Sequence, residues 1–242
     1  KEKMRNNIFF SIILPTYNRE KQILKAINSV IAQTFKNWEL IIIDNKSNDE
    51  TKKIVNSFNN SKIFFYQIEN NGIIAKSRNY GISKSSGNYL CFLDSDDWWD
   101  KDKLKYVNLA AEKGYSFIYH DHYVHAPNRL SKKRKIKSNF YNKPIFINLI
   151  KYGPKFATSS VVIEKKIFKK INYFDEDKQY IAWEDWDAWL RISKLTNSFF
   201  KINKTLSTVL IDDNNLLNSN LVIKNMKLFF DKYIKSDQQI PD

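Results

Sequence analysis

Short apolar runs that alternate with helical stretches restrict the fold of this chain more than any other feature of its sequence. Apolar runs typical of strands buried on both faces occupy residues 8–14, 38–43, 63–68 and 89–93. Between them, apolar residues recur every three or four positions, as on one face of a helix, at 23–31, 54–58 and 74–83. Alternating strands and helices with short connections form a mostly parallel sheet with right-handed crossovers. We therefore expect an α/β fold with a Rossmann-like sheet flanked by helices.

Polar residues ahead of the first two helices predict where those helices begin. Asn18 precedes the first helix and is a residue type that often caps a helix N-terminus. Ser47 and Glu50 have the spacing of a capping box ahead of the second helix. We expect these side chains to cap the two helices.

The pattern is looser beyond residue 99 but still predicts regular structure. Strands are predicted at 117–123, 159–163, 199–202 and 205–211, and helices at 184–195 and 221–234. Since no Pro- or Gly-rich linker interrupts the chain, we expect both halves to share one sheet in a single domain. The last predicted helix is amphipathic. We favour its packing on its own domain and keep contact with a membrane surface as the alternative.

The balance of charges favours anionic partners. There are 40 basic and 26 acidic side chains, so the formal net charge is 40 − 26 = +14. The densest basic patch lies at residues 129–137 and is either a solvated loop or an arm that lies on phosphates. We find neither zinc-finger spacing nor a basic region followed by heptads, and a nucleic-acid-binding protein therefore stays a minor alternative.

The single cysteine and the short apolar runs indicate in which cellular compartment the protein works. Cys91 is the only cysteine, which excludes an internal disulfide and a Cys-rich zinc site, and its place in a predicted strand indicates a small core residue. No apolar run approaches the about 20 residues that a transmembrane helix needs. We see no secretory signal. We expect a reducing compartment, either the cytosol or the cytosolic face of a membrane.

Polar residues directly follow three of the predicted strands. They are residues 15–19 after the first strand, Asp44 and Asn45 after the second, and the run Asp-Ser-Asp-Asp at 94–97 after the fourth. Ligands collect at the carboxyl ends of strands in open parallel sheets, so we expect these groups to meet at one site. Clustered carboxylates repel one another unless a cation lies among them. Mg²⁺ or Mn²⁺ bridging a substrate diphosphate is favoured over an acidic turn in which Asp97 caps a helix.

A second cluster, Trp183-Glu184-Asp185-Trp186, stands at the start of a predicted helix. One of its carboxylates, partly desolvated by the aromatic rings, could act as a general base, and the rings suit the apolar faces of sugars. An ordinary helix N-terminus, where acidic residues are favoured by the helix dipole, explains the cluster equally well.

Three histidines and one aspartate are close together in the sequence, as His120, Asp121, His122 and His125. On a strand, His120 and His122 share one face and His125 lies on the other, so at most two histidines converge. We favour a polar rim of the substrate cleft over a zinc site.

Taken together, these residues resemble glycosyltransferase family 2, whose members have the GT-A fold. The resemblance runs through residues 11–19, 39–49, 71–79 and 87–97 and continues at Glu184 and Asp185. It is strong over about the first 100 residues and looser over 150–195. One departure is the stretch 210–215, which lacks the Arg or His that many members carry there, and the third metal ligand therefore stays open.

The resemblance implies an inverting, nucleotide-sugar-dependent transferase and assigns roles to residues. The residues implied to bind the nucleotide-sugar are Pro15, Thr16, Tyr17, Arg19, Asp44 (to the uracil ring), Arg78 (near the diphosphate), Asp94, Ser95 and Asp96. Lys76 departs from the family pattern, in which many members have a small residue there, and we expect it to add a phosphate contact. Asp96 and Asp94 would hold the Mn²⁺ or Mg²⁺, and Asp185 would deprotonate the acceptor hydroxyl. The residues implied on the acceptor side are Trp183, Glu184 and Trp186.

The implied organisation is a nucleotide-sugar-binding half at 1–100, an acceptor-binding and catalytic half at 101–220, and a C-terminal amphipathic helix and tail at 221–242. The implied reaction moves a hexose or N-acetylhexosamine from a UDP-sugar to a hydroxyl of a glycan or lipid-linked acceptor. The product would be a surface polysaccharide such as O-antigen, capsule or lipooligosaccharide. We expect a cytoplasmic protein with peripheral contact to the cytosolic face of an anionic inner membrane, and no nucleic-acid partner. The alternatives are a metal-dependent nucleotidyltransferase or nuclease, a non-catalytic nucleic-acid-binding protein and a sugar-binding module.

Overall fold

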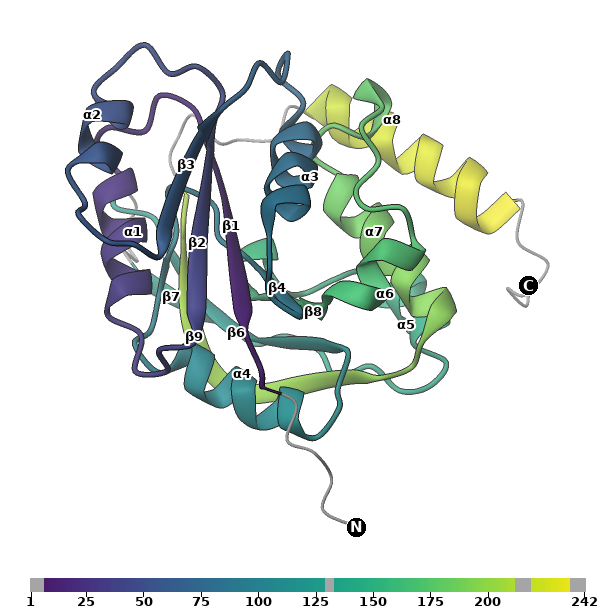
Figure 1. Cartoon of the computed structure of the whole chain (residues 1–242). Coiled ribbons are helices and arrows are strands. Elements are labelled where there is room, and N and C mark those ends of the chain that lie inside the picture. Colours follow the sequence, from purple (N-terminus) through teal and green to yellow (C-terminus); the bar gives the residue numbers. More distant parts are fainter. Residues whose placement is uncertain (1–6, 129–132, 212–218, 236–242) are drawn as a thin grey trace.

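One mixed sheet forms the centre of the molecule (Figure 1). The computed structural model describes residues 7–128, 133–211 and 219–235. Within these ranges the sheet runs in the order β3-β2-β1-β4-β8-β6-β9-β5, and β7 pairs with β6 at its side. The strands are β1 (Phe10–Thr16), β2 (Trp38–Asp44), β3 (Ile63–Gln67), β4 (Tyr89–Phe92), β5 (Trp98–Trp99), β6 (Phe117–His125), β7 (Lys133–Ile136), β8 (Val162–Glu164) and β9 (Phe199–Leu210).

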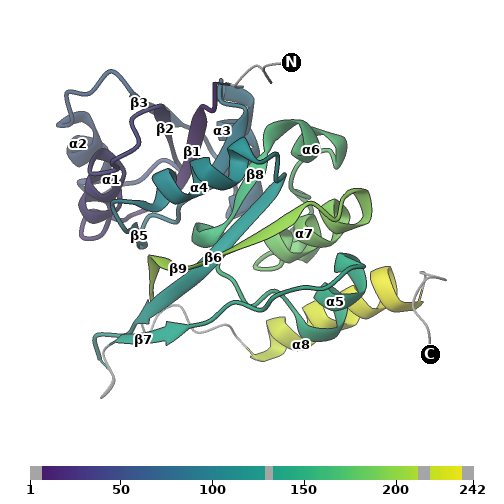
Figure 2. The ribbon, with the colours of Figure 1, turned by 90° about the horizontal axis from the view of Figure 1, so that it is seen from below.

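Helices cover both faces of this sheet (Figures 1 and 2). The α-helices are α1 (Ile23–Ile31), α2 (Thr51–Asn56), α3 (Ile74–Lys84), α4 (Lys103–Glu112), α5 (Ile145–Tyr152), α6 (Lys165–Lys170), α7 (Glu184–Leu195) and α8 (Ser219–Phe229). Two short 3₁₀ turns, η1 (Thr158–Ser160) and η2 (Lys178–Tyr180), lie in the second half, and the π-helical turn η4 (Phe230–Lys235) continues α8.

The two faces of the sheet bury separate apolar cores because side chains alternate along each strand. On β1, Ile12 and Leu14 face the core that α1, α2 and α4 cover, whereas Ile13 faces the core that α3, α5, α6 and α7 cover. Strands buried on both faces explain the near-continuous apolar runs in the sequence. The predicted α/β fold in a single domain is confirmed.

The first half of the sheet is parallel and the second half is mostly not. β1, β2, β3 and β4 pair in parallel, as predicted. β8 then runs antiparallel to both β4 and β6, and β6 and β7 form an antiparallel pair. The two strands predicted at 199–202 and 205–211 are one strand, β9, whose register against β6 shifts between His120 and His122. A local shift of register bends a strand without ending it.

The predicted helix caps are wrong. Asn18 has a left-handed backbone (φ 49°), and its side chain accepts a hydrogen bond from Asn48 N instead of capping α1. Ser47 donates its hydroxyl to Asp44, and α2 begins only at Thr51. These polar side chains therefore join the loops after β1 and β2 to one another at the sheet edge.

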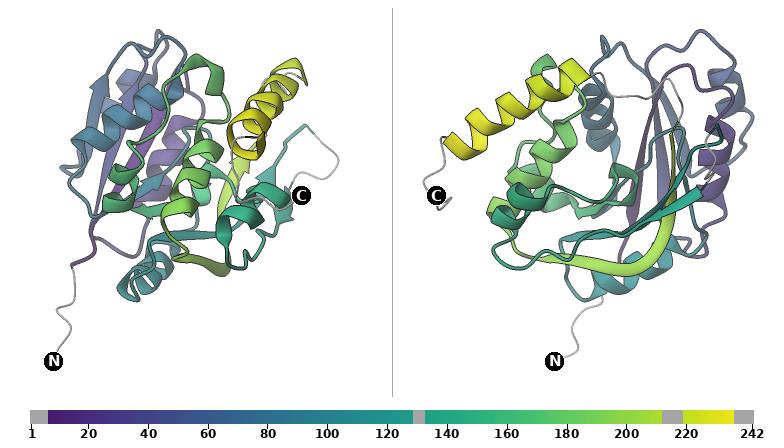
Figure 3. Two further views of the ribbon diagram at one scale, coloured as in Figure 1. Left: turned by 90° about the vertical axis from the view of Figure 1, so that its right-hand side faces the viewer. Right: turned by 180° about the vertical axis from the view of Figure 1, so that it is seen from behind.

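The C-terminal helix packs on its own domain, as favoured from the sequence. Figures 2 and 3 place α8 beside α7 and α5, and Phe229 and Tyr233 join the apolar core on that side. Met226 and Phe230, which the sequence pattern places near the same face, are instead exposed. Among the described residues, no helix has both the length and the apolar character to span a membrane.

Candidate active site

The carboxyl ends of β1, β2 and β4 meet at one edge of the sheet because these strands are parallel and in register, with Thr16 opposite Asp44 and Ile13 opposite Phe92. A cavity of about 240 Å³ opens there. It is lined by Pro15, Thr16, Tyr17, Arg19, Asn45, Asn70, Gly72, Ile74, Ser77 and Ser95. Five of these residues, Pro15, Thr16, Tyr17, Arg19 and Ser95, were predicted to bind the nucleotide-sugar, whereas Asn70, Ile74 and Ser77 were not.

The missed residues belong to the start of α3, where only the Asn-Gly pair at 71–72 signals a turn. Gly72 has a left-handed backbone (φ +77°), which turns the chain into the helix. Asn70 donates its amide to the Ser77 hydroxyl over 2.8 Å, in a buried contact. The turn thereby places polar atoms and a bare backbone against the cavity.

Two side chains at the end of β1 suit a flat, polar ligand. The Tyr17 ring is 53% exposed, and aromatic faces stack well on planar rings. Among the described residues, the buried Thr16 hydroxyl has no hydrogen-bond partner. Such a group in a native fold points to a ligand or to water.

Asp44 is fully buried at the end of β2 and is held from two sides. It accepts hydrogen bonds from the backbone and hydroxyl of Ser47 and, over 2.8 Å, from the Gln67 amide. The implied bond from Asp44 to a uracil ring stays a prediction. The same is true of Lys76, which is half-buried on α3.

The three acids after β4 divide into two kinds. Asp97 is buried and accepts hydrogen bonds from the Ser159 hydroxyl at 2.5 Å and from Leu210 N at 3.0 Å. Burial, with Asp94 and Asp96 close by, raises the pKa of Asp97 well above its usual range. Asp94 and Asp96 are more accessible, with side chains 32% and 15% exposed. Asp97 therefore fixes the turn from inside, whereas Asp94 and Asp96 pair with Arg78 and Arg19.

Asp94 and Asp96 supply two carboxylates at this turn, although no group of three or more His, Cys, Asp or Glu residues in the described ranges could by itself hold a metal ion. Two carboxylates beside a diphosphate are the donor set that Mg²⁺ or Mn²⁺ takes at phosphate sites. β9 ends at Leu210. Most of the stretch 210–215, on which the third metal ligand depends, lies outside the described residues.

Arg78 joins the acid turn to the second half of the chain. Its guanidinium lies 2.9 Å from Asp94 and 2.6 Å from Glu184, and its side chain is only 4% exposed. Burial raises the pKa of Glu184, although Arg78 and the backbone oppose the shift. Both groups thus form a buried bridge, while their implied contacts with diphosphate and acceptor stay predictions. Arg19 lies 3.4 Å from Asp96, the other acid of this turn.

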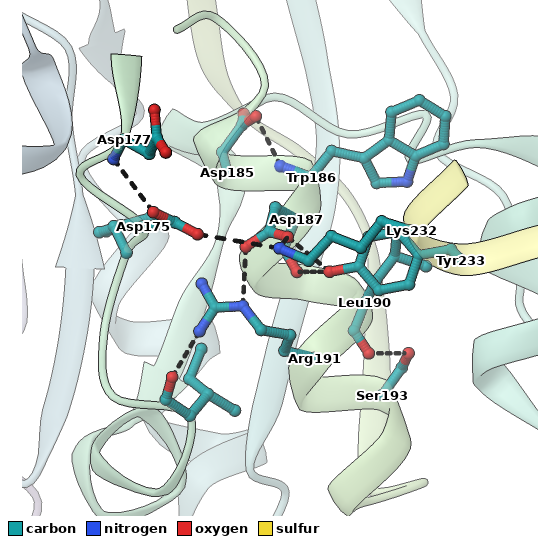
Figure 4. Close-up of polar contacts among 12 residues, drawn as sticks. Asp175, Asp177, Asp185, Trp186, Asp187, Leu190, Arg191, Ser193, Lys232 and Tyr233 are labelled. Carbon is teal, nitrogen blue, oxygen red and sulfur yellow. Dashed lines mark hydrogen bonds and ion pairs between the residues drawn. The ribbon is translucent and has the colours of Figure 1, made fainter. Parts of the chain in front are cut away.

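Asp185 lies in the first turn of α7, close to Thr158. Its carboxylate accepts the Thr158 hydroxyl at 2.5 Å and the Trp186 backbone N–H at 2.7 Å. Figure 4 shows Asp185 and Asp187, which are separated by Trp186 in this turn, with separate sets of contacts. Asp185 is half-buried, and its carboxylate contacts η1 through Thr158.

The C-terminal helix fixes the other side of α7. Asp187 is held by Arg191 at 2.7 Å, Lys232 at 2.7 Å and the Tyr233 hydroxyl at 2.5 Å (Figure 4). These partners lower the pKa of Asp187 against the opposing effect of burial. The first turn of α7 is therefore anchored on both sides.

The two tryptophans of the Trp-Glu-Asp-Trp cluster pack toward α8. Their ring centroids are 4.6 Å apart, and Trp186 stacks on Phe229 at 4.3 Å. Both side chains are half-buried. An acceptor-side role for Trp183 and Trp186 stays a prediction.

The histidine cluster is not a zinc site in the described part of the chain, where no group of three or more His, Cys, Asp or Glu residues could hold a metal. His120 and His122 are buried, so they are not a cleft rim, and burial lowers the pKa of both rings. Asp121 pairs with the buried Lys201 at 3.1 Å. Cys91 is fully buried as expected, and burial raises its pKa to about 12.

Comparison with known proteins identifies a family. A family model described as glycosyl transferase family 2 matches residues 11–172, which is 162 of 242 residues. An uncharacterized glycosyltransferase of Rickettsia typhi is 30% identical over 78% of this chain and 60% of its own length. A similar protein of Rickettsia felis is matched over 33% of its length. The chain thus spans between about a third and two thirds of these relatives.

Two relatives carry names that state a reaction or a pathway. An Escherichia coli protein named UDP-Glc:alpha-D-GlcNAc-diphosphoundecaprenol beta-1,3-glucosyltransferase WfgD is 31% identical over 77% of this chain and 70% of that protein. The amylovoran biosynthesis glycosyltransferase AmsB of Erwinia amylovora is 30% identical over 83% of this chain and 69% of that protein.

Solved structures support the GT-A fold. Staphylococcus aureus TarS 1-349 in complex with UDP-GlcNAc has a TM-score of 0.70 at 21% identity, covering 90% of this chain and 66% of that one. The mannosyltransferase PcManGT of Pyrobaculum calidifontis, in complex with GDP-Man and Mn²⁺, has a TM-score of 0.70 at 14% identity, covering 98% and 66%. At these identities the likeness concerns the fold alone.

Arg78→Met should lower the free energy of unfolding by about 3–5 kcal/mol, because it leaves the buried Glu184 without its cation. Loss of the guanidinium also raises the pKa of Glu184 further, so the carboxyl stays protonated in the fold. The Arg78→Met variant therefore keeps more of its stability at low pH and loses it as the pH rises through the raised pKa of Glu184. The difference in free energy of unfolding from the parent should be larger at about pH 8 than at about pH 5.

Chemical denaturation at the two pH values measures both effects. Lys53→Met is the matched control, since it breaks the exposed pair with Glu50 and should leave stability unchanged. An Arg78→Met protein as stable as the parent at both pH values would contradict the account.

Proposed function

Because the chain belongs to glycosyltransferase family 2, we propose that it transfers a sugar from a nucleotide-sugar to an acceptor hydroxyl with inversion at the anomeric carbon. The observation that supports this proposal is the pairing of Arg78 both with Asp94, which follows β4, and with Glu184, the neighbour of Asp185 on α7. Asp94 and Asp96 flank Ser95, which lines the cavity, and Asp185 lies in the first turn of α7. The Arg78 bridge from Asp94 to Glu184 holds the two sides together.

The proposed donor is a UDP-sugar that carries a hexose or N-acetylhexosamine. Tyr17, Thr16 and the polar start of α3 supply a pocket suited to a nucleotide, and Arg19 brings a positive charge to its edge. In support, TarS has been solved with UDP-GlcNAc, and the name of WfgD states a UDP-Glc donor. Asp96 and Asp94 would hold Mn²⁺ or Mg²⁺, which when bound neutralises charge on the leaving diphosphate.

Asp185 is proposed as the general base. Its carboxylate takes the proton of the acceptor hydroxyl while that oxygen bonds to the anomeric carbon. The bond from this carbon to the diphosphate oxygen breaks, and its electron pair leaves with UDP. The Thr158 hydroxyl and the Trp186 backbone N–H hold the carboxylate in one orientation, which is what a positioned base requires.

The proposed acceptor is a glycan or a lipid-linked sugar of surface-polysaccharide biosynthesis. The name of WfgD states a GlcNAc-diphosphoundecaprenol acceptor, and AmsB is named for amylovoran biosynthesis. Trp183, Glu184 and Trp186 are proposed to line the acceptor side, with the half-buried Trp183 ring available to a sugar face.

An anionic membrane surface is proposed as a further partner. Ile223, Met226 and Phe230 are 66%, 57% and 51% exposed and are spaced along one stripe of α8 and η4. Lys224 and Lys227 are exposed beside them. The basic β7 lies on the same side of the molecule, as Figures 2 and 3 show. Residues 129–132 of the basic patch lie outside the described residues.

Asp96→Ala should abolish metal-dependent binding of UDP and leave the fold intact, because it removes a proposed ligand from a partly exposed turn. Calorimetry with UDP and Mn²⁺ measures the change. Glu112→Ala, which removes an exposed acid on α4, should bind like the parent. Parent-like binding by Asp96→Ala would disprove the metal assignment. Stabilisation of the parent by DNA instead of UDP and Mn²⁺ would favour the nuclease alternative.

Asp185→Asn should reduce turnover at least about a hundredfold, the low end of general-base contributions. Affinity for UDP and Mn²⁺ should barely move, because the base contacts the acceptor and not the nucleotide. Release of UDP from UDP-glucose or UDP-GlcNAc in the presence of a GlcNAc-diphosphate-lipid acceptor gives the rate of transfer, and calorimetry gives the affinity. Asp231→Asn on the exposed side of η4 is the control. Near-normal turnover would remove Asp185 from this role.

Co-sedimentation with vesicles that contain anionic lipid should show binding with two separable parts. Basic residues contribute on the order of 1 kcal/mol each near such a surface, and salt screens this attraction. The double variant Lys133→Glu with Lys135→Glu should remove the salt-sensitive part, and Met226→Lys with Phe230→Lys the salt-resistant part. Absence of parent binding at low salt would reject the membrane partner.

A further inference from the structure

Three consecutive hydroxyl residues in the short turn η1 connect parts of the site that are far apart in the sequence. Thr158, Ser159 and Ser160 are all buried, with 8%, 0% and 0% of their surface exposed. Buried hydroxyls need hydrogen-bond partners, and each of these three finds a different one. The partners lie on α7, on the turn after β4 and on β9.

Thr158 contacts the acceptor side of the site. Its hydroxyl donates to Asp185 Oδ2 at 2.5 Å, while the other carboxylate oxygen, Oδ1, accepts the Trp186 N–H. The backbone N–H only fixes Asp185 to its own helix. The Thr158 bond is therefore the contact that sets the carboxylate relative to the rest of the site.

Ser159 contacts the donor side. Its hydroxyl oxygen accepts the Asp94 N–H at 3.1 Å and donates its proton to Asp97 Oδ2 at 2.5 Å. One side chain thus closes the turn that presents Asp94 and Asp96. The Ser159 carbonyl is itself fixed, since it accepts the buried Lys103 ammonium at 2.7 Å and the Trp99 indole N–H at 2.9 Å.

We propose that Thr158 and Ser159 are positioning residues that set the separation between the base and the acid turn. The inference rests on the proposed function, since it takes Asp185 as the base and Asp94 and Asp96 as donor-side groups. Thr158 and Ser159 are adjacent in η1, and the Ser159 carbonyl fixes this turn through its bonds with Lys103 and Trp99. The hydroxyls of Thr158 and Ser159 consequently hold the acceptor-side and donor-side acids in one fixed relation, which transfer in a single displacement requires.

The proposal predicts opposite kinetic signatures from neighbouring hydroxyls. Thr158→Val keeps the shape of the side chain and removes only its hydroxyl. It should lower kcat for UDP release from UDP-glucose, measured with the same GlcNAc-diphosphate-lipid acceptor, roughly 10- to 100-fold, as loss of a positioning contact does. Donor KM and calorimetric affinity for UDP with Mn²⁺ should stay at parental values. Thr158→Ser, which restores the hydroxyl, should recover most of the rate.

Ser159→Ala should instead lower the affinity for UDP with Mn²⁺. Loss of its hydroxyl releases the turn after β4, so the affinity for UDP with Mn²⁺ should fall roughly tenfold or more, in the range seen when an outer partner of a metal ligand is lost. Calorimetry reports this change without reference to activity. Ser160→Ala is the matched control, because its hydroxyl lies 3.0 Å from that of Ser207 and contacts neither acid. It should keep both parental values.

The outcomes separate failure of the inference from failure of the proposed function. A parent that binds UDP and turns over UDP-glucose, with Thr158→Val equal to it in kcat, would overturn the inference alone. Equal losses of kcat and affinity in both variants, or a loss in Ser160→Ala of the same size, would also overturn it, because they indicate a general packing defect. A parent that neither binds UDP nor turns over any UDP-sugar would overturn the proposed function itself.

Discussion

A single buried guanidinium holds the two halves of this site together. Arg78 enters from α3 and pairs with Asp94 from the sheet edge and with Glu184 from the first turn of α7. Arg78 and Glu184 are buried, and buried charges are tolerated when they are paired and hydrogen-bonded, whereas Asp94 is 32% exposed. The donor-side turn and the helix of the proposed base are therefore fixed to one another by an electrostatic need and not by apolar packing alone.

The turn η1 makes the same connection a second time with uncharged donors. Hydroxyls of Thr158 and Ser159 contact Asp185 and Asp97, while the guanidinium contacts Asp94 and Glu184. Each half of the site is thereby held at two points, which leaves little freedom for relative rotation. The contacts of Asp187 with Lys232 and Tyr233 add a third support from the C-terminal helix. A proton acceptor and a leaving-group site that must act together benefit from such rigidity.

The sequence predicted the parallel strands and the meeting of polar residues at their ends because both follow from local pattern. It did not predict which way the acids turn. Asp97 resembles Asp94 and Asp96 in sequence, yet Ser159 and Leu210, 62 and 113 residues away, draw it inward. Arg78 finds Glu184 across 106 residues. Asn18 and Ser47 fit local capping patterns but bond across two loops instead. The orientation of each of these side chains depends on contacts with segments that are distant in the sequence, and local residue spacing carries no information about such contacts.

The central claim is that an acceptor hydroxyl, deprotonated by Asp185, displaces UDP in one step at the site between β1, β4 and α7. Nuclear magnetic resonance of the product formed from UDP-α-glucose and a GlcNAc-diphosphate-lipid acceptor tests this most directly. A single displacement predicts a β-linked product, with a large coupling constant for the anomeric proton. An α-linked product would contradict the account, because retention of configuration requires a different mechanism from the one that this arrangement of acids supports.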